Sequence, residues 1–358
     1  MNNKTLIITN IPSPYRVLQF DELSKIYNGE LIVIYFKKIE YNRNWNIPNI
    51  NHKHIFLNQS FFLKYFLQFD LIKIILKEKP NIIIGAGFSL KVIFVFYLCK
   101  ILNIKFIVFT DSWLHSVNLL KRYHKIIRKL IIPHANASIC VGEKGILFLK
   151  KYKAKQGTIF LSPLSIDNAN YFKLYKSFKD KKYDIIFSGQ FIERKMPFFV
   201  IEILKKLSKV INNFKFLLIG SGDLEDEIIS RLKEYNIDFD FFGFIQQENL
   251  PKYYSNAKIL LFPTLDDPWG LVANEACAVG TPVITCNNAG VANDLIIHNY
   301  NGFVLPLSIE IWIQYIKLLL NDEDIYNRFS LNSIGAVKKY SIENASLGIY
   351  DAIKYVNE

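Results

Sequence analysis

The stretch Leu261–Asn287, LFPTLDDPWGLVANEACAVGTPVITCN, contains a strand, a helix and a second strand in direct succession. The apolar run that ends at Phe262 predicts a buried strand, and Pro268 and Trp269 mark the start of a helix. Gly280 is placed to end that helix as the residue after its C-cap. A buried strand, a helix and another buried strand in this order are typical of a parallel α/β sheet.

The same alternation continues along the rest of the chain. We expect strands at residues 4–9, 31–36, 81–84, 105–109, 137–141 and 158–161, and then at 184–188, 214–219, 239–242, 258–262, 282–286 and 302–304. Helices are expected between them at 16–28, 62–79, 89–102, 118–132 and 143–152, and then at 197–210, 224–235, 248–256, 269–279, 291–297 and 308–320. This pattern predicts an α/β protein with two doubly wound parallel sheets.

The composition agrees with two folded domains. The 358 residues are 51% hydrophobic and 21% charged, which excludes a disordered chain. The four cysteines form no CxxC pair, so we expect neither a disulfide scaffold nor a zinc module, and a reducing cytoplasm fits. The chain starts in a strand pattern without a signal peptide, and its most apolar stretch, residues 90–109, contains three lysines. We therefore expect a cytoplasmic protein without a membrane span.

A polar, lysine-rich stretch separates the two series of strands. Residues 168–183 predict a linker with little to bury. The first domain would cover residues 1–167 and the second 184–341, with the amphipathic C-terminal helix, residues 342–358, assigned to the first domain. Two such domains are expected to face a central cleft at the carboxyl ends of their strands, where folds of this kind bind ligands.

Two acids in the first stretch suit an elongated ligand. If Asp267 and Glu275 lie along one helix, they differ by about 80° around its axis and by about 12 Å along it. A sugar hydroxyl near Asp267 and a ribose near Glu275 would fit that span, and the helix N-terminus would favour phosphates between them. The alternative is that Asp267 is an N-cap and Glu275 a solvated helix residue.

The stretch resembles the E-x7-E region of retaining, nucleotide-sugar-dependent glycosyltransferases of family 4, of the bacterial polysaccharide, capsule and lipopolysaccharide type. Asp267 replaces the first glutamate and is one methylene shorter. Further motifs of that family resemble, in the same order, the segments NIPSPYR at 10–16, TDS at 110–112, PLSIDNANYF at 163–172, SGQFIERKMP at 188–197 and FGFIQQENLPKYY at 242–254. The resemblance implies the GT-B fold of two Rossmann-like domains, with the C-terminal helix crossing back.

The resemblance assigns donor roles in the second domain. It implies that Glu275 binds the donor ribose and Asp267 the transferred sugar, while Lys195, with Arg194, stabilises the leaving diphosphate. Lys195 also precedes Pro197, a helix N1 residue, where a cation suits a pyrophosphate; the alternative is an exposed Arg-Lys pair. Further donor contacts are expected at Gly189, Gln190, Gly222, Phe244, Ile245, Trp269, Gly270, Leu271 and Val272. Gln190 stands where the family usually has a basic residue.

The first domain would bind the acceptor. The expected acceptor-side residues are Ser13, Tyr15, Arg16 and Gly87, with Asp111 and His115 as candidate catalytic groups. The resemblance implies attack on the face from which the phosphate leaves, so that the protein mainly positions and stabilises. No metal and no cofactor are expected, since the nucleotide-sugar is a substrate. The DxD at 238–240, a metal motif in other glycosyltransferases, is interpreted here as the start of a strand.

The basic charge permits two other interpretations. The formal net charge is +12 at pH 7, and residues 112–166 contain ten basic residues and one acid. Such a face would attract anionic lipid at the inner face of a membrane, which suits a lipid-diphosphate-linked acceptor; a composition bias with solvated lysines explains it equally well. The alternative functions are a UDP-sugar epimerase of the same fold and a non-catalytic protein that binds nucleic acid or a partner. No nucleic-acid reading motif is present, so we expect none to be bound.

Overall fold

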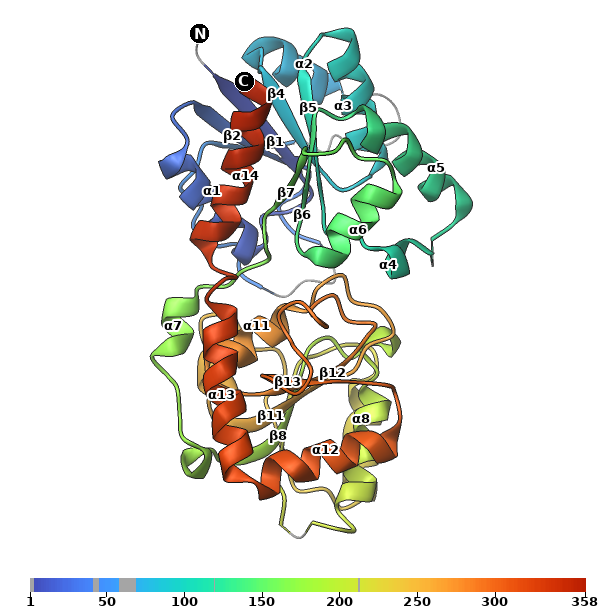
Figure 1. Ribbon diagram of the computed structural model, residues 1–358, viewed down its shortest axis with the longest axis vertical. Helices are drawn as coiled ribbons and strands as arrows, with labels where there is room; N and C mark the ends of the chain where they lie inside the picture. Colours follow the sequence, from blue (N-terminus) through green and yellow to red (C-terminus); the bar gives the residue numbers. More distant parts are fainter. Residues whose placement is uncertain (1–2, 41–44, 58–68, 119, 212) are drawn as a thin grey trace. The chain divides into compact units, whose positions relative to one another are not determined.

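The computed structural model describes residues 3–40, 45–57, 69–118, 120–211 and 213–358. The chain divides into two compact units (Figure 1). Unit 1 contains residues 1–164 and 342–358, and unit 2 contains residues 165–341. Each unit is an α/β structure around one parallel sheet. The expected fold class is therefore confirmed.

Unit 1 contains a parallel sheet with the strand order β3-β2-β1-β4-β5-β6-β7 in the described part of the chain. The strands are β1 Lys4–Thr9, β2 Glu30–Tyr35, β3 His54–Phe56, β4 Ile82–Ala86, β5 Lys105–Thr110, β6 Ala137–Cys140 and β7 Ile159–Leu161. Successive side chains of a strand point to opposite faces, so Ile7 joins one apolar core and its neighbours Leu6 and Ile8 join the other. The continuous apolar runs of the sequence thus reflect burial on both faces.

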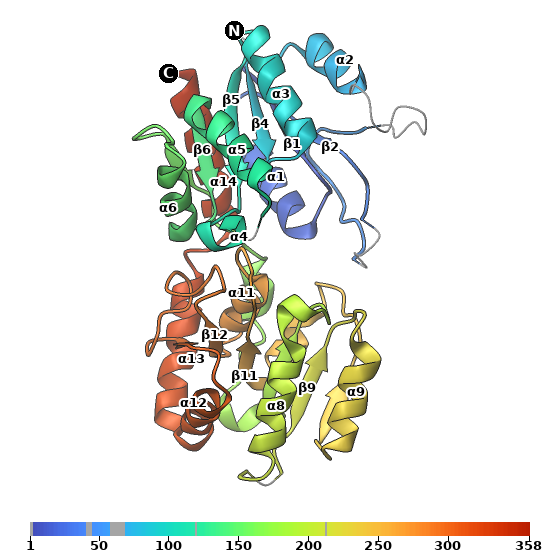
Figure 2. The same cartoon turned by 90° about the vertical axis from the view of Figure 1, so that its right-hand side faces the viewer.

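Helices cover both faces of this sheet. They are α1 Pro14–Ile26, α2 Phe69–Glu78, α3 Leu90–Ile101, α4 Leu114–Asn118, α5 Arg122–Ile131, η2 Ile132–His134, α6 Glu143–Lys151 and α14 Ile342–Asn357. The core between the sheet and α1 and α14 includes Phe20, Leu23 and Ile349. The core on the other face includes Leu71, Val95 and Ile131, from α2, α3 and α5. Figure 2 shows α3 and α5 side by side on that face.

The C-terminal helix α14 is part of unit 1. The Gln19 side chain donates to Ser162 Oγ at 2.6 Å and to the Ala345 carbonyl at 3.0 Å. The Ser346 hydroxyl donates to the Gln19 carbonyl at 2.8 Å. Gly348 lies so close to Leu161 that a Cβ there would collide with its carbonyl oxygen. These contacts explain why the last helix returns to the first unit, as expected.

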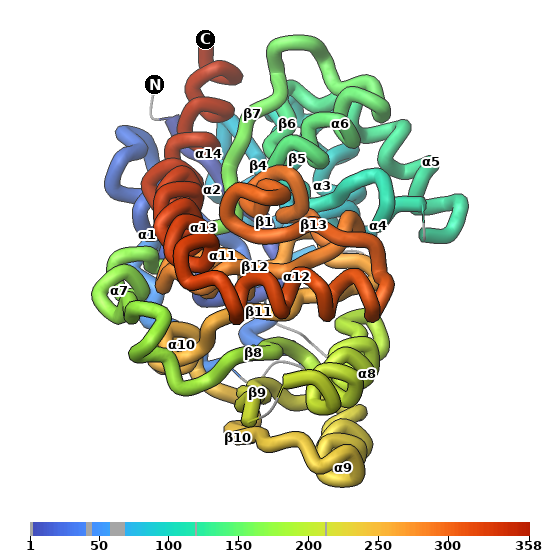
Figure 3. The backbone as a smooth tube through the Cα atoms, turned by 60° about the horizontal axis from the view of Figure 1, so that its bottom comes forward, coloured from blue at the N-terminus to red at the C-terminus, as the bar shows by residue number. Residues whose placement is uncertain are grey.

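Unit 2 contains a second parallel sheet, with the order β10-β9-β8-β11-β12-β13 in the described residues. The strands are β8 Tyr183–Ser188, β9 Phe216–Ile219, β10 Phe239–Phe241, β11 Ala257–Phe262, β12 Val283–Cys286 and β13 Gly302–Leu305. The helices are α7 Asn168–Phe172, η3 Phe178–Asp180, η4 Glu193–Lys195, α8 Pro197–Leu207, α9 Glu225–Glu234, α10 Leu250–Tyr254, α11 Leu271–Ala278, α12 Ile309–Asn321 and α13 Glu323–Val337. Figure 3 traces the backbone from α7 into β8 and onward through this unit.

The segment 168–183 is not a linker with little to bury, and that prediction is wrong. It contains α7, and Tyr171 is buried. The Lys181 ammonium is buried too and donates to the carbonyls of Ser255 and Ala257 and to Thr281 Oγ1, at 3.1–3.2 Å. A lysine-rich composition indicated exposure, but one lysine here satisfies three buried oxygen atoms.

One expected helix is absent from the structure, and two further elements were not predicted. Residues 291–297 form turns and isolated bridges instead of a helix, and Asn293 adopts the left-handed conformation at φ 63°. Helix α13 was not predicted, although Asp322 caps it by accepting from the Ile325 N–H at 2.9 Å. The short strand β3 was also missed. The beginning of the helix expected at 62–79 lies outside the described residues.

No helix in the described ranges is both long enough and apolar enough to cross a membrane. The segment 90–109 forms α3 and β5, as expected.

Candidate functional site

Asp267 lies in the loop between β11 and α11, before the helix begins. Gly270 takes a left-handed conformation with φ 104°, and α11 starts only at Leu271. A side chain at Gly270 would collide with the Phe262 ring, so the turn requires glycine. The expected helix start at Pro268 and Trp269 is therefore wrong, and helical spacing does not relate Asp267 to Glu275.

The other end of α11 agrees with the prediction. Gly280 is the residue after the C-cap and has φ 68°. Its N–H donates to the Cys277 carbonyl at 3.0 Å, and the Thr281 N–H donates to the Ala276 carbonyl at 2.9 Å. These two bonds form a Schellman motif. The helix α11, which carries Glu275, therefore ends at Ala278 with a hydrogen-bonded C-terminal motif.

Asp267 forms ion pairs with both cations predicted near the diphosphate. Its Oδ2 atom binds the Lys195 ammonium and lies 3.6 Å from Arg194 Nη1. Its Oδ1 atom accepts from the Trp269 N–H at 3.2 Å. Both partners of the Lys195 pair are largely buried, with 15% and 10% of their side chains exposed. Residues far apart in sequence thus form one charged cluster. The alternative of an exposed Arg-Lys pair is wrong for Lys195, whereas Arg194 keeps 39% of its side chain exposed.

Backbone contacts hold the two cations next to Asp267. The Arg194 carbonyl accepts from the Leu265 N–H at 2.9 Å and from Thr264 Oγ1 at 3.0 Å. The Arg194 guanidinium donates to the Asp266 carbonyl at 2.5 Å. Pro197 follows as the N1 residue of α8, as expected. The short helix η4 is therefore fastened to the loop that follows β11.

Glu275 is a buried acid and not a solvated helix residue. Only 7% of it is exposed. Burial raises its pKa to about 7, and the nearby hydroxyls of Tyr254 and Tyr171 partly offset this rise. Neither hydroxyl makes a hydrogen bond of normal geometry within the described chain. The structure therefore places a carboxyl group beside two phenols with unused hydrogen-bonding capacity, and α7 and α10 supply the phenols.

Glycines let three loops approach each other at the ends of β8, β9 and β10. A Cβ at Gly220 would collide with the Gly189 carbonyl, and one at Gly222 would meet the Phe191 backbone. The Gly220 N–H donates to the Gly243 carbonyl at 2.8 Å. Gly189 has φ 152° and faces open space, next to Gln190. Gly220 and Gly222 thus serve packing, whereas the surroundings of Gly189 leave room for a ligand.

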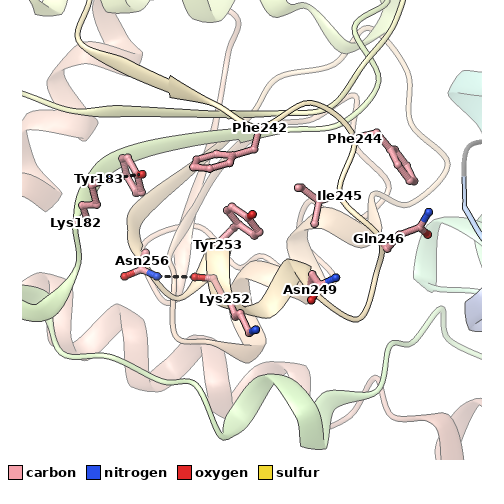
Figure 4. Close-up of a pocket in the computed structure, with 10 residues that line it drawn as sticks. All are labelled: Lys182, Tyr183, Phe242, Phe244, Ile245, Gln246, Asn249, Lys252, Tyr253 and Asn256. Atoms are coloured by element: carbon pink, nitrogen blue, oxygen red, sulfur yellow. Dashed lines mark hydrogen bonds between the residues drawn. The ribbon is translucent and has the colours of Figure 1, made fainter.

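Phe244 and Ile245, expected at the donor base, line a cavity of about 590 Å³ in unit 2. Figure 4 shows Phe242, Phe244 and Ile245 along one side, with Tyr253 and Asn249 of the α10 region across from them. The Phe242 and Tyr253 rings pack edge to face, with centroids 4.9 Å apart. Phe242, Asn249 and Tyr253 were not among the predicted site residues. The available signal was the motif FGFIQQENLPKYY at 242–254, which contains all three.

Trp269 has a structural side chain. It is buried, donates from Nε1 to Asn274 Oδ1 at 2.9 Å, and packs against Tyr340. Its backbone N–H is bound to Asp267. Leu271 and Val272 lie half-buried in the first turn of α11. The Trp269 side chain therefore serves packing, and a donor contact at Trp269, Leu271 or Val272 stays a prediction.

The acceptor-side residues lie together in unit 1. A cavity of about 250 Å³ at the carboxyl ends of β1, β4 and β5 is lined by Ser13, Tyr15, Arg16, Gly87 and Asp111. The same cavity is lined by Asn10, the first residue of the motif NIPSPYR, and by Glu40 and Trp45, which the sequence motifs did not indicate. His115 is not among the lining residues, and its ring packs near that of Trp113.

Arg16 is held rigidly in this cavity. Its guanidinium lies over the Phe109 ring, 4.3 Å from the centroid, and donates to Gln19 Oε1 at 2.6 Å. Burial lowers the pKa of Arg16, and the charge of Asp111 acts against this effect. A planar donor and the carboxylate of Asp111 thus face the same cavity, an arrangement suited to sugar hydroxyls.

The DxD segment forms the start of β10, as predicted. The Asp240 carboxylate binds the Lys182 ammonium at 2.8 Å and accepts from the Tyr183 hydroxyl. Across the described residues there is no cluster of three His, Cys, Asp or Glu side chains that could hold a metal ion.

The two Rossmann-like units define the class, a protein of the GT-B fold. Residues 173–335 match the family model described as glycosyl transferases group 1. The expected resemblance to this glycosyltransferase family, also called family 4, is confirmed for this part of the chain.

One curated relative is the GalNAc-α-(1→4)-GalNAc-α-(1→3)-diNAcBac-PP-undecaprenol α-1,4-N-acetyl-D-galactosaminyltransferase of Campylobacter jejuni. It is 24% identical over 222 residues, which are 62% of this chain and 60% of that protein. The chain spans about half the length of the first curated relatives that it matches.

Two solved structures are similar over nearly the whole chain. Sucrose-phosphate synthase from Thermosynechococcus elongatus has a TM-score of 0.78 at 20% identity, covering 99% of each chain. HepE from Anabaena, in complex with UDP and glucose, has a TM-score of 0.76 at 14% identity, covering 98% of this chain and 99% of that one. At these identities the similarity shows the fold alone.

Proposed function

We propose that this protein transfers a sugar, with retention of anomeric configuration, from a nucleoside diphosphate sugar to a hydroxyl of a growing cell-surface glycan. UDP-sugars are the favoured donors and GDP-sugars the second choice. The observation that carries the proposal is the arrangement of charged groups in unit 2. Asp267, Arg194 and Lys195 form a cluster where η4 meets the loop after β11. The buried Glu275 lies on α11, the helix that follows this loop.

Each group in unit 2 suits one part of the donor. Glu275 and its two neighbouring phenols offer hydrogen bonds to the ribose hydroxyls. Arg194 and Lys195 supply positive charge for the diphosphate. Asp267 can accept a hydrogen bond from the transferred sugar. Phe244 and Ile245 offer an apolar wall for the base.

The reaction that fits these groups needs no covalent link to the protein. The acceptor oxygen forms a bond to the anomeric carbon on the face from which the diphosphate leaves. The bond between that carbon and the phosphate oxygen breaks, and the acceptor proton passes to the leaving phosphate oxygen. Lys195 and Arg194 stabilise the charge that develops on this oxygen, which is an electrostatic contribution to catalysis.

The acceptor is proposed to enter the cavity of unit 1. A cavity of about 250 Å³ suits a single sugar residue. Asp111, Glu40 and Arg16 would bind its hydroxyls, and Trp45 and Tyr15 offer faces for stacking. The name of the relative from Campylobacter jejuni specifies a PP-undecaprenol-linked glycan, which supports a lipid-linked acceptor. The basic, half-exposed face of α5 supports contact with anionic lipid.

A thermal-shift panel tests the proposal. Wild-type protein and Glu275→Gln are mixed with UDP, GDP, ADP, CMP, NAD and a short RNA. A ligand at about 100 times its Kd adds about 2.7 kcal/mol, which is a readable shift. We expect one nucleoside diphosphate to stabilise the wild type and to lose most of this effect in Glu275→Gln. The exposed Glu234→Gln on α9 is the matched control and should respond like the wild type.

The panel also separates the alternative functions. If RNA alone shifts the melting temperature, the chain is a basic binding protein and the donor assignment is wrong. If UDP binds, an assay with a UDP-sugar and no acceptor distinguishes an epimerase, which would convert the sugar, from a transferase. The family match supports the transferase.

A further inference from the structure

One carboxylate in unit 2 neutralises two cations. Among the ion pairs of the described chain, Arg194 and Lys195 have no acidic partner other than Asp267. Both approach the same oxygen, Oδ2. A donor diphosphate that uses these cations must therefore share them with this carboxylate, or replace it.

The carboxylate is much less mobile than the lysine that it binds. Asp267 accepts from the Trp269 N–H through Oδ1, its own N–H donates to the Asn288 carbonyl at 3.1 Å, and its carbonyl accepts from the Gly290 N–H at 2.8 Å. Lys195 reaches it through a flexible four-carbon side chain. The Lys195 side chain can therefore move toward a competing anion without rearranging the loop after β11, whereas Asp267 cannot.

We propose that Asp267 is an internal counter-ion that competes with the donor's diphosphate for Lys195 and Arg194. This inference rests on the proposed function and adds a role for Asp267 beyond contact with the sugar. A diphosphate carries more negative charge than one carboxylate and displaces Asp267 from Lys195. The competition weakens the hold on the nucleoside diphosphate product and so favours its release.

The proposal distinguishes Asp267 from an ordinary ligand-binding acid. If Asp267 only contacts the transferred sugar, its removal leaves UDP affinity unchanged, because UDP has no sugar beyond the ribose. If it is a counter-ion, its removal frees Lys195 and tightens the binding of every diphosphate. The sign of the change in UDP affinity therefore decides between the two roles.

The test is calorimetric titration of the full-length protein with UDP, uridine and inorganic pyrophosphate. Asp267→Asn keeps the side-chain size and the hydrogen bond from Trp269 but removes the charge. We expect it to bind UDP and pyrophosphate about tenfold more tightly, which is about 1.4 kcal/mol. Uridine, which has no phosphate, should bind the variant and the wild type equally.

The matched control is Glu193→Gln. Glu193 is exposed, directly precedes the two cations and forms no ion pair with either of them. The variant makes the same change in net charge beside the site, so it reports general electrostatics. We expect its UDP affinity to stay within twofold of the wild type. An equal gain in both variants would overturn the proposal.

A double-mutant cycle adds a second test. Lys195→Gln should weaken UDP binding, and Asp267→Asn in that background should give a much smaller gain than in the wild type. An unchanged or weaker affinity of folded Asp267→Asn for pyrophosphate would also overturn the proposal. The pyrophosphate experiment does not depend on donor recognition. If the wild type binds none of the nucleoside diphosphates of the thermal-shift panel, the proposed function fails, and titration with pyrophosphate still decides whether Asp267 competes for the cations.

Discussion

The ion pairs and the pKa of a carboxyl group depend on its surroundings, as Asp267 and Glu275 show. Both acids come from one short stretch and both are largely buried. Asp267 is paired with two cations, whereas Glu275 lies among apolar groups and phenols. Burial raises the pKa of Glu275 to about 7.

The raised pKa of Glu275 predicts a pH-dependent stability. In the unfolded chain the carboxyl group has its ordinary pKa of 4.5, and in the folded protein it has a pKa of about 7. Between these values the folded state retains a proton that the unfolded state has lost, so the free energy of unfolding falls as the pH rises. This stabilising contribution is complete below pH 4.5 and lost above pH 7. The expected loss is about 3 kcal/mol.

Urea unfolding at pH 5, 6, 7 and 8 measures this contribution. Glu275→Gln carries no titrating group at this position, so its stability relative to the wild type should increase from pH 5 to pH 7 and level off by pH 8. Other titrating groups are common to both proteins and cancel in the difference. A constant difference between the two proteins would show that the carboxyl group is already ionised in the folded state at pH 5.

At the scale of elements, α5 combines positive charge with exposed apolar side chains. Tyr123, Ile126 and Leu130 are each about half exposed. The helix contains four basic residues and no acid. Such a helix suits the surface of an anionic membrane.

The basic residues of α5 should contribute to the binding of anionic vesicles. Replacing the exposed Arg122 and Lys129 by glutamine should weaken binding to phosphatidylglycerol vesicles by about 30-fold, since each basic residue near the surface contributes about 1 kcal/mol. Phosphatidylcholine vesicles should bind neither protein well. A control variant with Lys209→Gln and Lys233→Gln, at two exposed positions of unit 2, makes the same charge change. Equal losses in both variants would mean that net charge, and not α5, directs binding.

At the scale of the whole molecule, the chain completes its first unit with its last helix. The α14 backbone packs directly against Leu161 at Gly348, where a side chain cannot fit. Residues separated by most of the sequence thus share one core, which includes Ile7, Phe20 and Ile353. Docking of α14 should therefore be part of the folding of unit 1.

Two glycines in helices test this docking. Gly348→Ala should destabilise unit 1 by about 1–3 kcal/mol, because the helix must move away from Leu161. Gly335→Ala is the control, since that glycine lies exposed in α13 with open space around it. It should stabilise the protein by about 0.5–1 kcal/mol through its higher helix propensity. Chemical denaturation monitored by circular dichroism measures both changes. Equal stability of Gly348→Ala and the wild type would contradict the proposed tight packing.

The sequence alone determined both sheets, most helices and the resemblance to the glycosyltransferase family. Runs of apolar residues such as those of β1, β5 and β11 are long and continuous, so periodicity identifies them without knowledge of the partner strands. Local signals also placed Gly280 and Pro197 correctly, since a helix end depends on nearby residues. The motifs likewise indicated residues that meet in the cavity of unit 1, and their contact with an acceptor stays a prediction.

Only the tertiary structure decided the environment of each charged group. Lys195 and Asp267 are 72 residues apart in the sequence, and no local pattern indicates that they pair. The burial of Glu275 depends on tyrosines from α7 and α10, and the burial of Lys181 depends on carbonyls around β11. Local propensity sets which elements form. The charge state and partners of a side chain depend on which distant segments pack against it.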